Sequence, residues 1–306
     1  MIIDSGTREA PLLIEGRRKY GQYVSAAVLL LLSAMLLWSL AKNPNMQWNV
    51  AWSYLFNIDI LAGLVNTIVL TVICMILGVV LGTLLAIMRL SANPVLRTVS
   101  YLYVWIFRGT PLLVQLIFWY NLALIFKVLG VGIPFTDISI STPTNTLITG
   151  FVAAILGFTL NEAAYMAEIM RSGISSVDPG QREAALSSGM TESLAMRRIT
   201  LPQAMRVIVP PTANQAINML KATSLVAFIS GGDLLSRVQD IYAVNFKVIP
   251  LLLTACFWYL VLTTIASIGQ HYLERSVGKG FTSFTDHAEA VAVEQNNPPA
   301  RPSDWK

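Results

Sequence analysis

Long apolar runs alternate with short polar stretches along most of this chain. A helix needs about 20 mostly apolar residues to cross the hydrocarbon core of a bilayer. Segments of this kind lie at 23–41, 60–88, 99–126, 147–170, 212–231 and 249–272. We therefore expect an all-α, polytopic membrane protein with about six transmembrane helices.

The composition supports a membrane protein and argues against a nucleic-acid-binding one. Of the 306 residues, 55% are hydrophobic and only 12% are charged, whereas a soluble domain carries about 25% charged residues. The formal net charge is +4, but the basic residues are scattered between the apolar runs and form no basic patch. We expect membrane lipid, and no nucleic acid, among the partners.

The distribution of Lys and Arg predicts the orientation. Fifteen basic residues precede the first run, follow the last or lie in two of the connections, and four lie in the alternate connections. Basic loops tend to stay in the cytoplasm. Both termini and the connection 171–206 are therefore expected to be cytoplasmic. The two remaining basic residues, Arg108 and Lys221, fall at membrane depth.

The two ends of the chain are expected to differ from its middle. Residues 1–22 are polar and form a cytoplasmic N-terminal segment before an additional transmembrane helix at 23–41. Ser39-Leu40-Ala41 resembles a signal-peptide cleavage site, so the retention of this helix stays open, although the run is longer than a usual signal core. Residues 282–306 are polar and without period, as in a disordered cytoplasmic tail. The stretch 128–146 has no helical period either and is expected to be an external loop.

Glycine and proline positions predict how the helices pack and bend. Gly78 and Gly82 are four residues apart, a spacing that lets a second helix approach closely. Pro111 cannot donate a helical hydrogen bond, so we expect a kink or break in the third segment. Pro210-Pro211 fits the first turn of the fifth segment, where missing N–H groups cost little.

The cytoplasmic connection 171–206 is expected to fold by itself. Pro179-Gly180 predicts a turn and residues 181–188 a short helix, which Gly189 would end. Thr191 is a suitable cap for a second helix, and Leu201-Pro202 is expected to end or bend it. Such a helix–turn–helix between two membrane-anchored segments suits docking to a protein better than binding to DNA.

Polar and charged side chains at membrane depth are the candidate substrate pathway. A charge at that depth is costly and normally faces the interior of the bundle with a partner. The candidates are Arg108, Gln115, Asn161, Glu162, Asn214, Asn218 and Lys221. In one interpretation they form a pocket in which Glu162 holds an ammonium group or a cationic side chain. In the other, Glu162 pairs with Lys221 or Arg108 and only fixes helix packing. Glu168 and Arg171 are three residues apart and are expected to pair on one helix face.

No catalytic or metal-binding constellation occurs in the sequence. The only histidines, His271 and His287, are unsuited to a triad or a zinc site inside the membrane. Neither a G-x-x-x-x-G-K-[ST] phosphate loop nor a G-x-S-x-G elbow is present. Cys74 and Cys256 fall inside apolar runs and are interpreted as packing residues. We expect a protein that is not an enzyme and that has no catalytic residues, cofactor or metal.

One pattern in the connection 171–206 resembles a known family. It reads EAA, three residues, Gly, nine residues, Ile, one residue, Leu-Pro, at Glu183, Ala184, Ala185, Gly189, Ile199, Leu201 and Pro202. This pattern is typical of the cytoplasmic loop of permease subunits in ATP-binding-cassette (ABC) importers. The blocks 107–115, 164–169 and 220–226 are similar to the polar amino-acid branch of that family. The resemblance covers a permease domain at about 60–275, with a five-helix core to which 23–41 is an addition.

The resemblance implies a function and a set of partners. The chain would be the permease subunit of an ATP-driven, binding-protein-dependent amino-acid importer in the bacterial inner membrane. A second permease subunit, identical or different, would complete the pore, and a pair of ATP-binding subunits would bind the nucleotide that this chain does not bind. A solute-binding protein would deliver the amino acid. The seven pattern residues would couple the permease to the ATPase, with Gly189 and the apolar side of 183–202 forming the contact.

Two other functions remain as alternatives. A secondary, ion-coupled transporter usually shows internal repeats, and this sequence shows none. A non-transporting membrane scaffold would use the cytoplasmic connection for docking, but it leaves the polar residues at membrane depth unexplained. The importer is the favoured interpretation.

Overall fold

A computed structural model of the chain describes residues 20–132 and 139–278 and divides it into two compact units, 1–48 and 49–306. The first unit contains α1 (Tyr20–Lys42) and the short 3-10 turn η1 (Pro44–Met46). The helix expected at 23–41 is therefore present and slightly longer. The predicted N-terminal segment lies almost wholly outside the described residues, as does the predicted tail at 282–306.

In its described residues the second unit is helical apart from one small sheet, which agrees with the all-α prediction. Short elements join long ones in the order α2 (Trp48–Tyr54), α3 (Ile58–Leu90), α4 (Pro94–Gly109), α5 (Leu112–Tyr120), η2 (Leu122–Leu124), β1 (Val128–Gly132), β2 (Ser139–Pro143), α6 (Thr144–Leu147), α7 (Gly150–Ser175), α8 (Pro179–Ser187), α9 (Glu192–Ala195), η3 (Met196–Thr200), α10 (Leu201–Ala222), η4 (Thr223–Ile229), α11 (Leu234–Asn245) and α12 (Val248–Gly278).

Not every predicted span has its expected length. Within the described parts of the chain, α1, α3, α7 and α12 are long and apolar enough to cross a membrane, and α4 with α5 makes a fifth if the bent pair is one span. The apolar run predicted at 212–231 is instead divided between α10 and η4. The count of about six spans and the orientation of the termini stay predictions.

The helix break expected at Pro111 is confirmed, because α4 and α5 are bent by 99° there. The break leaves backbone carbonyl groups without helical donors, and two amide side chains supply them. Gln115 Nε2 donates to the carbonyl oxygens of Phe107 and Thr110 at 3.0 and 3.1 Å. Asn161 Nδ2 donates to the Phe107 oxygen at 2.9 Å. These two side chains therefore stabilise the break.

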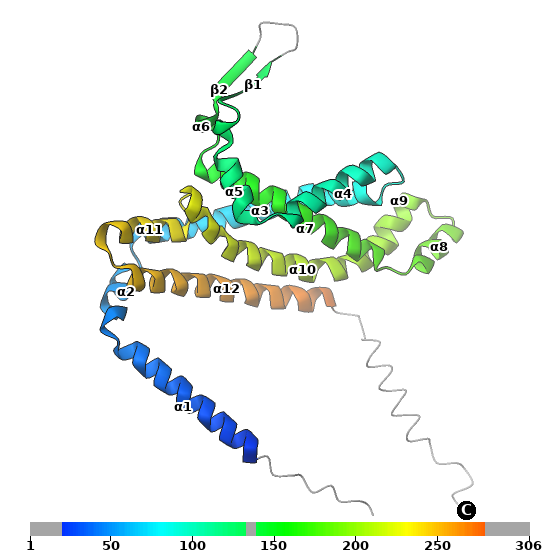
Figure 1. Cartoon of the computed structure of the whole chain (residues 1–306). Helices are drawn as coiled ribbons and strands as arrows, with labels where there is room; N and C mark the ends of the chain where they lie inside the picture. Colours follow the sequence, from blue (N-terminus) through cyan, green and yellow to red (C-terminus); the bar gives the residue numbers. More distant parts are fainter. Residues whose placement is uncertain (1–19, 133–138, 279–306) are drawn as a thin grey trace, which may run out of the picture. The chain divides into compact units, whose positions relative to one another are not determined.

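Helix α7 is at the centre of the second unit and packs against α3, α4, α5 and α10 (Figure 1). Its contact with α3 is the most extensive, and Gly78 and Gly82 make that contact possible, as predicted. A Cβ atom added to Gly82 would lie 2.4 Å from Met166 Cβ, and one added to Gly78 would lie 2.8 Å from Glu162 Cγ. Both distances are shorter than van der Waals contact allows. The two helix backbones therefore approach more closely than side chains at these positions would permit.

The predicted helix start at Pro210-Pro211 is wrong, because both prolines lie inside α10. They leave the carbonyls of Arg206 and Val207 without i+4 donors, but both of these residues are exposed, where water can bind the freed oxygens. Of the two outcomes expected at Leu201-Pro202, an end or a bend, the end is wrong. The N–H of Leu201 donates to Met196, five residues back, so the chain passes through a π turn and continues into α10.

The stretch 128–146, expected to be an external loop without helical period, contains a β-hairpin and the short helix α6. Strands β1 and β2 pair antiparallel, with Val128 opposite Pro143 and Gly132 opposite Ser139. Residues 133–138 between them lie outside the described part. Each strand has only five residues, in which β-branched residues alternate with Gly, Ser or other residues. So short a segment gives only a weak strand signal in the sequence.

Candidate functional site

A cavity of about 300 Å³ lies between α5, α7 and α10. Its walls combine apolar and polar side chains from Leu112, Asn161, Glu162, Tyr165, Gln215, Asn218, Met219 and Ala222. Three of the seven predicted pathway residues therefore line one cavity, and these three come from two helices far apart in sequence.

Glu162 is the charged group of this cavity. Its side chain is 4% exposed, and Gln215 Nε2 lies 3.5 Å from each carboxylate oxygen. In the described part of the chain, no Lys or Arg forms a salt bridge with it. The predicted pairing with Lys221 or Arg108 is therefore not found. A buried carboxylate held by one long amide contact retains most of its capacity to bind a cation.

Three predicted residues of α10 share an exposed face. Asn214, Asn218 and Lys221 are all exposed, and Asn218 Nδ2 donates to Gln215 Oε1 at 3.3 Å. Hydrocarbon cannot satisfy such groups, so this face must lie against water or another protein. Our sequence reasoning missed Gln215, which connects this face to Glu162. Its position beside the stripe of polar residues was the available signal.

The other predicted pathway residues have different surroundings. Gln115 is buried, and its Oε1 accepts a hydrogen bond from Asn161 Nδ2 at 3.3 Å. It therefore contacts Asn161, a residue of the cavity wall, without lining the cavity itself. Arg108 lines a second cavity, of about 390 Å³, with Arg89, Glu168 and the aromatic Tyr165. Tyr165 lines both cavities. The guanidinium of Arg108 lies 5.1 Å from the centre of the Tyr165 ring.

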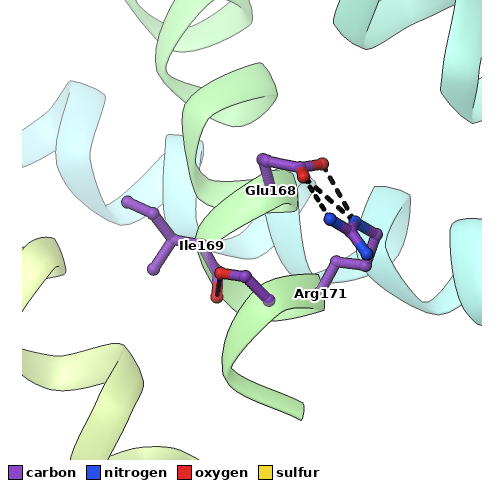
Figure 2. A network of polar contacts seen from close by, with 4 residues as sticks. Glu168, Ile169 and Arg171 are labelled. Atoms are coloured by element: carbon purple, nitrogen blue, oxygen red, sulfur yellow. Dashed lines mark hydrogen bonds and ion pairs between the residues drawn. The ribbon is translucent and has the colours of Figure 1, made fainter. Parts of the chain in front are cut away.

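The predicted Glu168–Arg171 pair is confirmed. Both carboxylate oxygens of Glu168 accept from Arg171, through Nε and Nη2. Figure 2 shows the two side chains facing each other on one side of α7, while Ile169 points to another side. The pair spans three residues of one helix and stabilises the end of α7 that leads into α8.

Helices α8 and α9 form the predicted helix–turn–helix. Gly189 stands between them with a φ of 86°, and the N–H of Met190 donates to the Ala185 oxygen at 3.1 Å. A bidentate salt bridge between Arg182 and Glu192 joins the two helices at their exposed side. The turn is therefore fixed by its backbone conformation and by a bridge across it.

The seven pattern residues do not all lie at the surface of this loop. Ala185 is buried at 6% exposure and Ile199 is half-buried; these two belong to the packing of the loop itself. The exposed ones are Glu183, Ala184, Gly189, Leu201 and Pro202. The apolar side chains of Leu194, Leu201 and Met205 are exposed as well, at 37%, 39% and 39%. The loop thus presents apolar side chains among charged ones of both signs, with exposed Arg197, Arg198 and Arg206 beside Glu183.

Comparisons with known proteins agree with this geometry. The family model described as "binding-protein-dependent transport system inner membrane component" matches residues 78–279. The arginine transport system permease protein ArgU of Corynebacterium glutamicum is 46% identical over 94% of this chain and 90% of its own length. The probable amino-acid ABC transporter permease protein YckA of Bacillus subtilis is 34% identical over 74% of this chain and 96% of its own. A crystal structure of an amino acid ABC transporter with histidines is 35% identical, with a TM-score of 0.60, and covers 71% of this chain and 94% of that one.

Proposed function

The chain belongs to the inner-membrane components of binding-protein-dependent transport systems and is a permease of the amino-acid importers. From this membership we propose which of its residues face the substrate and which face the ATPase. The substrate would pass along the polar face of α10 and the cavity at Glu162. The α8–α9 loop would receive the motion of an ATP-hydrolysing subunit.

The exposed polar face of α10 is the observation that carries the pathway proposal. Asn214, Asn218 and Lys221 lie on a helix between membrane-spanning elements, and lipid would leave their hydrogen-bonding groups unsatisfied. A path for a zwitterionic solute needs donors and acceptors of this kind. Because one chain leaves the face open, a second permease subunit, identical or different, would close the path.

The α8–α9 loop supports the proposed ATPase contact. It exposes apolar side chains outside the helix bundle, and the Arg182–Glu192 pair bridges its turn at Gly189. The sequence contains no phosphate loop, so ATP would be bound by partner subunits, one under each permease. A rigid docked element can transmit their closure because packed interfaces switch between discrete arrangements. A solute-binding protein on the opposite side of the membrane would deliver the amino acid.

A basic amino acid is the substrate class that we propose. Glu162 is buried, and its only described polar partner is the neutral Gln215, so an ammonium or guanidinium group of the substrate would compensate its charge. The name of the similar ArgU protein points to the same class. The competing interpretation is that Glu162 only fixes α7 to α10 through Gln215.

Uptake by the reconstituted importer separates these interpretations. In a Glu162→Gln variant we expect arginine uptake to fall about 10- to 100-fold while glutamine uptake changes little, since a hydrogen bond to a charged group contributes about 1.5–3 kcal/mol. Glutamate uptake serves as a further comparison. Asp59→Asn is the matched control, because Asp59 is an exposed carboxylate in the first turn of α3.

Unchanged selectivity among arginine, glutamine and glutamate in Glu162→Gln would contradict the substrate role. An equal loss for all three amino acids, together with a lowered melting temperature, would favour the packing role instead. The family membership and the pathway on α10 would stand in either case.

A further inference from the structure

The second cavity, of about 390 Å³, lies between the last turn of α3, the second half of α4 and α7. This is the end of the bundle from which α8 and α9 extend. Two arginines, Arg89 in the last turn of α3 and Arg108 in the last turn of α4, line it. Arg108 is a predicted pathway residue, but it lines this cavity and not the one at Glu162, and no role has been given to Arg89.

Both arginines lack an anionic partner in the part of the chain that the structure describes. Arg89 lies with its guanidinium 4.6 Å from the centre of the Tyr101 ring, and its Nη1 is buried without a hydrogen-bond acceptor. Arg108 lies over the Tyr165 ring. Aromatic rings attract a cation weakly, by about 0.5–2 kcal/mol, and do not satisfy the N–H groups of a guanidinium. An anion would.

The one carboxylate on the wall of this cavity does not supply that anion. Glu168 has both oxygens bound to Arg171. Because Arg171 pairs with Glu168, the charges of Arg89 and Arg108 remain without a paired carboxylate in this cavity. Arginine is well suited to phosphate because its planar fork binds two oxygens at once.

The outer surface of α4 beside this cavity is apolar and aromatic. Val99, Leu102 and Ile106 are exposed at 50%, 47% and 47%. Tyr101 and Trp105, which line the cavity, are exposed at 52% and 65%, and rings of these types are enriched at the level of the lipid headgroups. Basic groups between helices beside an apolar helix face are the arrangement that anionic lipids bind.

We propose that this cavity binds the headgroup of an anionic phospholipid, with a phosphate oxygen pair between Arg89 and Arg108 and the acyl chains along the exposed side of α4. The apolar strip favours a lipid over a free phosphate, which would use the arginines alone. The site is independent of the proposed substrate, and its place at the α8–α9 end puts it in the leaflet next to the coupling loop.

Lipid binding to the purified, delipidated importer complex tests this site. Phosphatidylglycerol, phosphatidylcholine and inorganic phosphate are titrated separately, and bound lipid is counted by native mass spectrometry. We expect phosphatidylglycerol to bind and the Arg89→Gln/Arg108→Gln double variant to need at least tenfold more of it for half-occupancy. Arg97→Gln is the matched control, because Arg97 is an exposed arginine of α4 that does not line the cavity.

Two further variants keep the test decisive. Brominated phosphatidylglycerol should quench the fluorescence of Trp105. In a Trp105→Phe variant, the fraction of tryptophan fluorescence that this lipid quenches should therefore be smaller. If the double variant fails to fold, the single variant Arg108→Gln replaces it, because Arg108 is exposed. It should raise the phosphatidylglycerol concentration needed for half-occupancy several-fold. Equal binding of phosphatidylcholine, full displacement by inorganic phosphate or by an amino acid, or unchanged phosphatidylglycerol binding in the variants would each overturn the proposal. Loss of permease pairing with unchanged lipid binding would identify a protein interface instead and overturn it too.

Discussion

At the scale of single residues, the sequence singled out polar side chains at membrane depth but not their partners. Gln115 and Asn161 attracted attention as amides in apolar sequence, and the structure shows both bound to the Phe107 carbonyl at the helix break. A sequence reveals that Pro111 frees carbonyl groups, but it does not reveal which residue of a distant helix lies opposite them. The same limit hid Gln215, whose contact with Glu162 joins positions 53 residues apart.

Gly189 gives the sharpest residue-scale prediction for the coupling loop. Its φ of 86° is one that β-branched residues rarely adopt, and no atom lies within 4 Å of an added Cβ, so backbone strain alone decides the effect. Strain of this kind costs about 1–3 kcal/mol. We expect Gly189→Val to lower transport and transport-linked ATP hydrolysis about tenfold or more in proteoliposomes.

Gly189→Asn is the control for that prediction. Asparagine tolerates positive φ far better than valine, so its transport should stay near that of the unaltered protein. A Gly189→Val importer that transports and hydrolyses ATP normally would remove the coupling role from this turn.

At the scale of whole elements, prolines predicted one helix boundary and misled on another. Pro111 follows Gly109-Thr110 and breaks the helix by 99°, because two weak helix formers precede it and amide side chains satisfy the freed carbonyls. Pro210 and Pro211 lie inside α10 without ending it. The carbonyls that they free belong to exposed residues, so continuing the helix costs less there. The two cases differ in the partners of the freed carbonyls, which are side chains of α5 and α7 at Pro111, and the sequence does not show these partners.

The close packing of α3 on α7 carries the element-scale prediction. An alanine at an exposed helical glycine normally stabilises a helix by about 0.5–1 kcal/mol. At Gly82 the new methyl group would overlap Met166 and approach the Ala163 oxygen at 2.9 Å. We therefore expect Gly82→Ala to destabilise the permease by about 1–3 kcal/mol, measured as a lower melting temperature of the purified complex.

Gly269→Ala is the matched substitution for Gly82→Ala. Gly269 also lies within a long helix, α12, but nothing is within 4 Å of its added Cβ. The melting temperature of the Gly269→Ala protein should equal or exceed that of the unaltered protein. A Gly82→Ala protein as stable as the Gly269→Ala protein would mean that α3 and α7 are less closely packed than the structure indicates.

At the scale of the whole molecule, the apolar periodicity and the EAA pattern were sufficient for the fold class and the family. The helices at 23–41, 60–88, 147–170 and 249–272 were found within a few residues of α1, α3, α7 and α12. The segment predicted at 212–231 overlaps α10 but misses its first turns, because the stretch 201–211 gave no continuous apolar signal, and the hairpin β1–β2 was not predicted.

The importer assembled in proteoliposomes from this permease, its ATP-binding subunits and its solute-binding protein tests the account most directly. Uptake of labelled arginine is measured with the complete set and after omission of ATP, of the ATP-binding subunits or of the solute-binding protein. We predict uptake only with the complete set and loss to background after each omission. Accumulation of arginine by the permease alone, driven by an ion gradient, would contradict the account.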